Sequence, residues 1–155
     1  AGRLFDAVSA ALGVCFDRQG YEGQAAMELE ALAEPHFDSE MPWPGADGVK
    51  VGPMAWDWLW RSLTGDLRAG VDRGQIAARF HRSLIEATAA TAISVAKQND
   101  VQRIALSGGV FQNRLLLENV HAALTAAGHD VLVHRLVPAN DGGLSLGQAA
   151  IASLS

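Results

Sequence analysis

The hydrophobic pattern changes twice between a strand-like and a helical period in the last third of the chain. Residues 103–106 and 131–137 are short apolar runs, and residues 112–127 and 143–154 have apolar positions at helical spacing. This order predicts an α/β fold in which two strand–helix units place their strands parallel in one small sheet. Because parallel strands end at the same edge of a sheet, we expect the loop after each strand at that edge.

Helical periods fill most of the chain before these units. Asp72 precedes the longest period and is a good N-cap, because its carboxylate can accept hydrogen bonds from the first N–H groups of a helix. His81 lies beside the apolar stripe of this helix, which predicts a surface or boundary position for it. The predicted helices are residues 4–12, 22–34, 56–65 and 72–98.

A proline-rich stretch separates the second of these helices from the third. Residues 35–55 hold four of the five prolines, which predicts a loop with a short strand at 49–51. Trp56 and Trp60 share one face of the following helix, and Trp58 projects elsewhere. The tryptophans either pack in the core or, if Trp58 is exposed, form a surface that binds a partner.

Composition indicates one packed domain. The chain has 155 residues, of which 49% are hydrophobic and 19% charged, enough to bury a core. Its net charge of −5 and scattered Lys and Arg residues argue against nucleic acid as a partner, because binding phosphates needs a basic face. No apolar run has the length of a membrane span. The lone Cys15 excludes an internal disulfide, favours a cytoplasmic location and is predicted to be a small buried side chain.

Both loops at the predicted sheet edge carry a glycine pair. Ser107, Gly108 and Gly109 follow the first strand. Either the glycines serve only the geometry of the turn, or the turn and the N–H groups of the next helix bind an anion, with Asn113 bonding a sugar or base. Asp141 precedes the second pair and is either a helix N-cap or an oxygen ligand that needs further metal ligands.

Two further observations limit the chemistry. Asp6 lies on a different side of the first helix from its apolar residues and is either a solvated acid or an acceptor for a ribose hydroxyl. The five histidines contain no pair spaced i, i+4, so the chain has no local two-histidine metal site.

Four segments, taken in their order along the chain, resemble the C-terminal region of the HypF carbamoyltransferases of nickel–iron hydrogenase maturation. They are residues 2–8 (GRLFDAV), 21–26 (YEGQAA), 106–114 (LSGGVFQNR) and 138–149 (PANDGGLSLGQA). The resemblance runs over nearly the whole chain. It implies the second lobe of an actin-like ATPase domain (ASKHA, RNase H-like) of the Kae1-like type, with a small mixed sheet of parallel strands flanked by helices.

The resemblance implies roles for the matching residues. In the related tRNA-modifying proteins, residues that match Asp6 and Gly23 contact a nucleotide ribose, and one that matches Asn113 contacts the nucleotide. Gln24 stands where those relatives carry a glycine, which favours the HypF branch. The implied nucleotide-binding residues are Asp6, Gly23, Ser107, Gly108, Gly109 and Asn113, and the implied metal ligand is Asp141.

The activity that the resemblance implies is carbamoyl transfer. In HypF-like proteins, carbamoyl phosphate and ATP yield a carbamoyl-adenylate in another domain. The Kae1-like domain passes the carbamoyl group to the C-terminal cysteine of HypE, and the thiocarbamate is dehydrated to the nitrile that becomes cyanide on the active-site iron. The implied ligands and partners are ATP or carbamoyl-adenylate, a carbamoyl phosphate-derived substrate and a HypE-like protein.

The family's histidine metal ligands lie in its first lobe, and this chain has no such pair. We therefore expect residues 1–155 to be a single domain that contains only the second lobe, as a fragment or a short family member. By itself it should not transfer carbamoyl groups, and it should bind iron or zinc only together with the first lobe. The alternative is a non-catalytic module that docks HypE or another maturation partner through the Trp56–Trp60 region. A sheet edge left open would also allow a homodimer.

Overall fold

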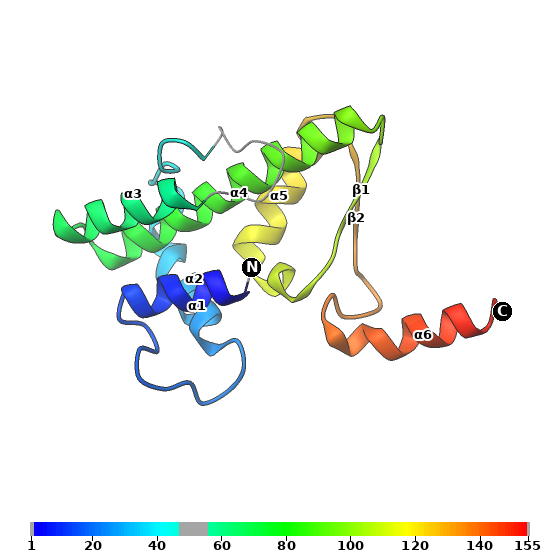
Figure 1. The fold of residues 1–155 in the computed structure, drawn as a ribbon, viewed down its shortest axis with the longest axis horizontal. Helices are drawn as coiled ribbons and strands as arrows, with labels where there is room; N and C mark the ends of the chain where they lie inside the picture. Colours follow the sequence, from blue (N-terminus) through cyan, green and yellow to red (C-terminus); the bar gives the residue numbers. More distant parts are fainter. Residues whose placement is uncertain (1, 47–55, 155) are drawn as a thin grey trace.

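The computed structural model describes residues 2–46 and 56–154 (Figure 1). The helices and strands predicted within these residues are confirmed, and the strand predicted at 49–51 lies outside them. The α-helices are α1 (Gly2–Ala11), α2 (Gln24–Ala33), α3 (Asp57–Arg68), α4 (Arg73–Gln98), α5 (Arg114–Ala126) and α6 (Leu144–Ala152). The strands are β1 (Arg103–Leu106) and β2 (Asp130–Val133), and the short 3₁₀ helices are η1 (Glu34–His36), η2 (Gly109–Gln112) and η3 (Asp141–Gly143).

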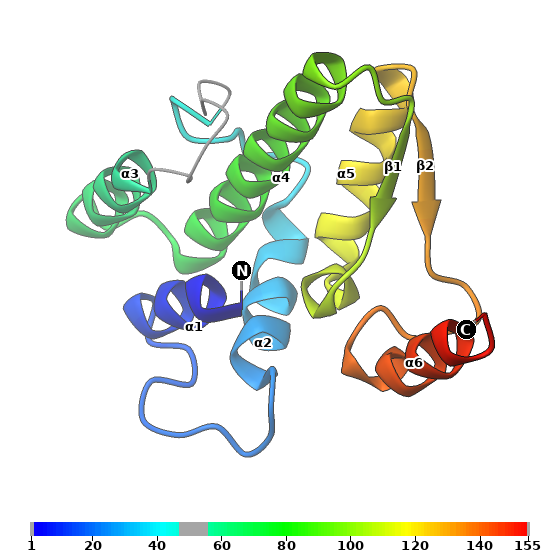
Figure 2. The same ribbon diagram turned by 45° about the vertical axis from the view of Figure 1, so that its right-hand side comes forward.

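Helix α4 is the centre of the fold. Helices α2, α3 and α5 pack against it, and α1 packs against α2 (Figures 1 and 2). Phe5 of α1 and Phe80 of α4 meet edge to face, with ring centroids 5.1 Å apart, and both are fully buried. Their apolar area, removed from water, is a main source of stability for this helical part. Other fully buried core residues are Leu12, Leu29, Leu59, Leu63, Ile76, Val120 and Leu124.

Strands β1 and β2 form a small parallel sheet. Their register places Arg103 opposite Asp130 and Leu106 opposite Val133. Strand β2 ends at Val133 rather than at residue 137 as predicted, because β1 ends at Leu106 and offers no further groups for the ladder. Helix α5 packs beside β2, and the sheet residues on the better covered face are Ile104, Leu106, Val131 and Val133.

The other face of the sheet and helix α6 are uncovered. Ala105 and Leu132 on that face are exposed. No residue of α6 is buried, and the helix stands apart from the helices around α4 (Figures 1 and 2). Leu144, Leu146 and Leu154 are all more than half exposed, which is unusual for leucine. This end of the molecule therefore presents apolar surface that the described residues do not cover.

Two predicted helix boundaries are confirmed by their hydrogen bonds. Asp72 is the N-cap of α4, where its Oδ1 accepts from Gly74 N at 2.8 Å and Gln75 N at 3.3 Å. Gly128 follows α5 with a φ of 90°, and its N–H donates to Thr125 O at 2.9 Å, as in a glycine-ended helix. None of the helices in the described parts of the chain has the length and apolar character that a membrane crossing requires.

The three tryptophans around the start of α3 are half-buried and pack against the core. The rings of Trp56 and Trp58 lie 6.4 Å apart. The partner-binding hypothesis required an exposed Trp58, and the structure does not meet that condition, because Trp58 lies partly in the protein. Core packing, the other interpretation, agrees with these positions.

An ion network joins the segment that contains Glu40 and Trp43 to α3 and α4. Arg79 Nε donates to Glu40 Oε2 at 2.7 Å, and Arg79 Nη1 donates to Asp66 Oδ2 at 3.0 Å. Gln75 Nε2 and Trp43 Nε1 add hydrogen bonds of 2.8 Å to Glu40 and Asp66, respectively. Glu40 is only 8% exposed, so its charge depends on these partners.

We expect Arg79→Met to lower the free energy of unfolding by about 2 kcal/mol, because it leaves Glu40 buried without a cation. The effect stays below that of a fully buried pair because solvent reaches the Arg79 side chain, which is 28% exposed. Urea unfolding followed by far-UV circular dichroism measures it. Arg61→Met, at an exposed position of α3, is the matched control and should change stability by less than about 0.5 kcal/mol. Equal losses in both variants would contradict the role of the network.

Candidate functional site

The loops that follow β1 and β2 meet at the carboxyl edge of the sheet, as the sequence predicts. Gly108 N donates to Ala139 O at 2.8 Å, and Ser107 Oγ lies 2.9 Å from His134 Nε2. Gly108 has a φ of 104°, a conformation that side-chain-bearing residues rarely adopt, so the turn needs glycine at this position. The two glycine-bearing loops therefore form one continuous surface.

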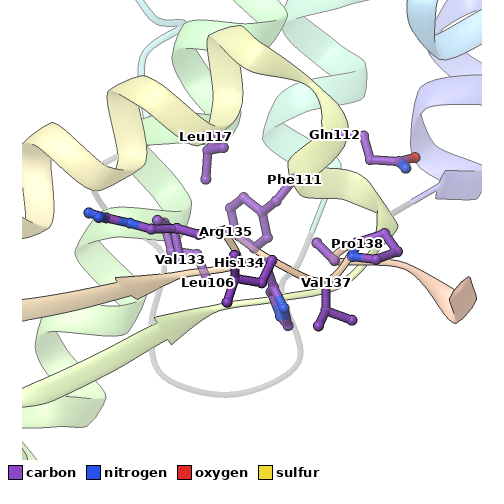
Figure 3. A pocket seen from close by; sticks show the side chains of 11 residues that line it. Leu106, Phe111, Gln112, Leu117, Val133, His134, Arg135, Val137 and Pro138 are labelled. Carbon is purple, nitrogen blue, oxygen red and sulfur yellow. The ribbon is translucent and has the colours of Figure 1, made fainter. Parts of the chain in front are cut away.

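A pocket of about 360 Å³ lies between these loops, the strand ends and the start of α5 (Figure 3). Figure 3 shows Phe111 of η2 between Leu117 of α5 and the two strands. Most of the lining residues are apolar, and the longer polar side chains among them are Gln112, His134 and Arg135. Its size lies at the lower end of roughly 300–1,000 Å³, the range of small-molecule sites.

None of the residues predicted to bind nucleotide or metal lines this pocket. Ser107, Gly108 and Gly109 lie between its lining residues Leu106 and Phe111 along the chain, so the predicted turn borders the pocket. The sequence pattern does not reveal the lining residues 134–137, because they fall in the stretch predicted to be strand. Phe111, a large apolar residue within a glycine-rich loop, is the one feature of the sequence that could have indicated a pocket here.

The first backbone N–H groups of α5 are already bound by side chains of this chain. Asn113 Oδ1 accepts from Leu116 N at 2.8 Å. Glu30 Oε1 of α2 accepts from Arg114 N at 2.7 Å and from Leu115 N at 3.1 Å. An anion at a helix N-terminus uses these same N–H groups. Of the two interpretations of this turn, anion binding by the first N–H groups of α5 is therefore not supported, because Asn113 and Glu30 already accept hydrogen bonds from them.

His81 is fully buried, so the prediction of a surface or boundary position is wrong. Its Nδ1 lies 2.8 Å from Ala77 O, and its Nε2 lies 3.0 Å from Asn113 Nδ2. The rings of Phe5 and Phe80 contact it edge to face at centroid distances of 5.6 and 5.4 Å. Burial lowers the pKa of His81 to about 4, although the hydrogen bond to Ala77 acts in the opposite direction. The imidazole is therefore neutral at physiological pH.

The side chain of Asn113 is held inside the protein by its hydrogen bonds with His81 and Leu116, and the residue is 8% exposed. Its backbone is extended, with φ −69° and ψ 114°, as is usual for the N-cap of a helix. The side chain that the resemblance assigns to a nucleotide thus also caps α5 and binds His81.

The two residues implied in ribose binding lie within α1 and directly before α2. Asp6 is exposed on α1, directly after the buried Phe5. Gly23 is the residue before α2 and has a φ of 80°, which favours glycine there. Neither residue lines the pocket, and both are open to solvent.

Asp141 lies at the start of η3 and is exposed. It is not the N-cap that its position suggested, because Asn140 takes that role and its Oδ1 accepts from Gly142 N at 3.0 Å. Within residues 2–46 and 56–154, no group of three or more His, Cys, Asp and Glu side chains could hold a metal ion. Asp141 therefore does not complete a metal site with the described residues.

Cys15 is half-buried rather than buried, and its thiol donates to Glu28 Oε2 at 3.2 Å. Burial and the adjacent Glu28 carboxylate raise the pKa of the Cys15 thiol. Because a nucleophilic cysteine needs a lowered pKa, this environment agrees with a structural thiol.

Comparison with known proteins gives one consistent family. The family model described as carbamoyltransferase, Kae1-like domain, second subdomain, matches residues 1–148. The chain is 40% identical over 153 residues to carbamoyltransferase HypF of Rhodobacter capsulatus, covering 99% of this chain and 19% of that protein. It is also 40% identical over 159 residues to a HypF homolog of Cupriavidus necator, covering 99% of this chain and 40% of the relative.

Solved structures agree with these relatives. A full-length HypF in a phosphate- and nucleotide-bound form superposes with a TM-score of 0.85 at 36% identity, over 97% of this chain and 20% of that one. HypF of T. kodakarensis superposes with a TM-score of 0.80 at 30% identity, over 99% of this chain and 20% of that one. The chain thus has the fold of one part of a much longer protein.

Proposed function

The chain belongs to the HypF carbamoyltransferase family, within the second subdomain of its Kae1-like domain, and from this we propose that it is a nucleotide-binding lobe. Its ligand is ATP or the carbamoyl-adenylate formed from ATP and carbamoyl phosphate. The complete enzyme passes the carbamoyl group to the C-terminal cysteine thiolate of a HypE-like protein. The chain alone supplies binding groups and does not catalyse the transfer.

The meeting of the two glycine-bearing loops is the observation that carries this proposal. Gly108 and Ala139, far apart in sequence, are joined by a backbone hydrogen bond at one sheet edge. Ligands of open α/β sheets bind beyond the carboxyl ends of the strands. A related full-length HypF, which matches 97% of this chain with 20% of its own length, has been solved in a phosphate- and nucleotide-bound form.

Under this proposal the phosphates, the ribose and a metal ion each have their own set of residues. Because Glu30 and Asn113 occupy the first N–H groups of α5, the phosphates bind at the Ser107–Gly109 turn instead. Asn113 contributes its remaining side-chain N–H, and Asp6 and Gly23 contact the ribose. Asp141 is the one residue of this lobe proposed as a metal ligand. The described residues do not form the rest of a metal site, so no step of the function is derived through a metal.

The uncovered apolar surface supports a two-lobed site. Leucines of α6 and of the outer sheet face are exposed, and they lie near the second loop along the chain. The family model that matches this chain describes a second subdomain. We assign this surface to contacts with the first subdomain. A docking module built on Trp56–Trp60, the alternative function, gains no support from the structure, because Trp58 is half-buried.

Calorimetric titration of the chain with ATP tests the proposal. We expect the wild-type chain to bind ATP with micromolar affinity. Asp6→Ala should weaken this binding by about tenfold or more, because it removes a hydrogen bond from a ribose hydroxyl to a carboxylate. Asp6 is exposed, so its substitution leaves the core intact. Asp57→Ala, which removes an exposed carboxylate from α3, a helix away from the loops after β1 and β2, is the matched control and should bind like wild type (Figure 1).

Asn113→Ala is expected to abolish ATP binding in the same titration, since it removes both the nucleotide contact and the cap of α5. Failure of the wild-type chain to bind ATP would contradict the proposal and favour a non-catalytic docking module.

A further inference from the structure

We propose that His81 is a positioning residue that fixes the Asn113 carboxamide so that one side-chain N–H is presented to the nucleotide. The inference deepens the proposed function and rests on it. It follows from five contacts of His81 and Asn113, all of them between buried residues.

The tautomer of His81 follows from its partners. Ala77 O can only accept a hydrogen bond, so the proton of the neutral imidazole is on Nδ1, 2.8 Å away. Nε2 then has a lone pair and no proton. Its partner at 3.0 Å must donate, which identifies the facing atom of Asn113 as Nδ2.

The oxygen of the Asn113 carboxamide has a partner that requires the same orientation. Oδ1 of Asn113 accepts from Leu116 N at 2.8 Å, as an N-cap oxygen does. A carboxamide rotated by half a turn would place Oδ1 against the lone pair of His81 Nε2 and Nδ2 against a backbone N–H. Both contacts would be repulsive, so His81 and the helix start select one orientation together.

This orientation leaves one group of Asn113 for a ligand. The carboxamide has two N–H donors, and His81 is the single partner that Nδ2 has among residues 2–46 and 56–154. The second N–H therefore has no partner among these residues, and it is the group of Asn113 that we propose for the nucleotide at the end of the Ser107–Asn113 segment. Without the His81 acceptor, only the hydrogen bond from Leu116 N would hold the carboxamide, and the direction of its N–H groups would be less well defined.

The surroundings hold the imidazole in place. Phe5 and Phe80 contact the ring edge to face at 5.6 and 5.4 Å, and His81 itself is 0% exposed. Phe5 is adjacent to Asp6, so the helix that carries the proposed ribose acceptor packs on the residue that orients Asn113. The packing thus links two parts of the proposed nucleotide site.

Two variants separate positioning from folding. His81→Leu removes the acceptor, whereas His81→Gln keeps an oxygen acceptor and an N–H donor on a side chain of comparable reach. At a temperature where all three proteins are folded, we expect His81→Leu to weaken ATP binding by about tenfold and His81→Gln to stay within about threefold of wild type. An ATP affinity of His81→Leu equal to that of wild type would overturn the proposal, while wild-type chain that does not bind ATP would overturn the proposed function instead.

A spectroscopic measurement that needs no nucleotide completes the test. Long-range ¹H–¹⁵N spectra of the wild-type chain at neutral pH should show His81 protonated on Nδ1 and unprotonated on Nε2. The Asn113 side-chain amide should have one slowly and one rapidly exchanging proton in wild type and His81→Gln, and two rapidly exchanging protons in His81→Leu. A proton on Nε2, or Asn113 signals that do not respond to His81→Leu, would overturn the positioning role even if ATP binds.

Discussion

Replacing Phe80 with alanine is expected to lower the free energy of unfolding by about 4 kcal/mol, the loss typical of deleting a buried aromatic ring. Phe80 is 0% exposed and meets Phe5 edge to face at 5.1 Å and His81 at 5.4 Å. Removal of the ring leaves a cavity between α1 and α4. The two helices could close this cavity only by displacing the buried imidazole of His81. Guanidinium chloride unfolding followed by circular dichroism gives the change in stability.

Phe16→Ala is the matched control, because it deletes the same ring from a position that is 72% exposed. We expect it to change the free energy of unfolding by less than about 0.5 kcal/mol. If Phe80→Ala were as mild as Phe16→Ala, the described core around α1 and α4 would be wrong.

Acidification should destabilise the chain through His81. In the unfolded chain a histidine takes up a proton as the pH falls through about 6.5, whereas the folded chain resists it until about pH 4. Between these values the unfolded state binds more protons, so stability rises with pH in this window and is lost as the pH falls. The loss from His81 alone is about 3 kcal/mol between pH 7 and 4.

The difference between wild type and His81→Gln isolates this contribution, since carboxylates titrate equally in both. We expect the stability of His81→Gln, measured by urea unfolding at pH 4.5 and 7, to fall less than that of wild type. The groups that contact the ring are Phe5, Phe80, Ala77 and Asn113, and none of these titrates. Parallel pH dependences for both proteins would show that His81 keeps an ordinary pKa in the fold.

Features that depend on neighbours in sequence were predictable. The change of hydrophobic period predicts β1, α5 and β2, and Asp72 and Gly128 mark helix ends because their caps form within a few residues. The end of β2 was not predictable in this way. It depends on where its partner β1 turns away at Ser107, and an apolar run alone does not contain that information.

The location of the candidate site could be predicted from the sequence, but the contacts among its residues could not. Parallel strands bring the two glycine-bearing loops together, as the hydrogen bond from Gly108 to Ala139 confirms. Glu30 reaches α5 across 84 residues, and His81 reaches Asn113 across 32. Such pairs arise from how α2, α4 and α5 pack in three dimensions, and a periodicity that describes one helix at a time does not encode them.

The nucleotide site at the sheet edge is tested most directly by titrating ATP into the ¹⁵N-labelled chain and mapping the shifts of its backbone amides. We expect the largest shifts at Gly108, Gly109 and Gly23, with smaller ones at the start of α1. Amides of α3, on the opposite side of the molecule, should not move (Figure 1). Shifts confined to α3 and residues 39–44, or no shifts at all, would contradict a nucleotide site formed by the loops after β1 and β2.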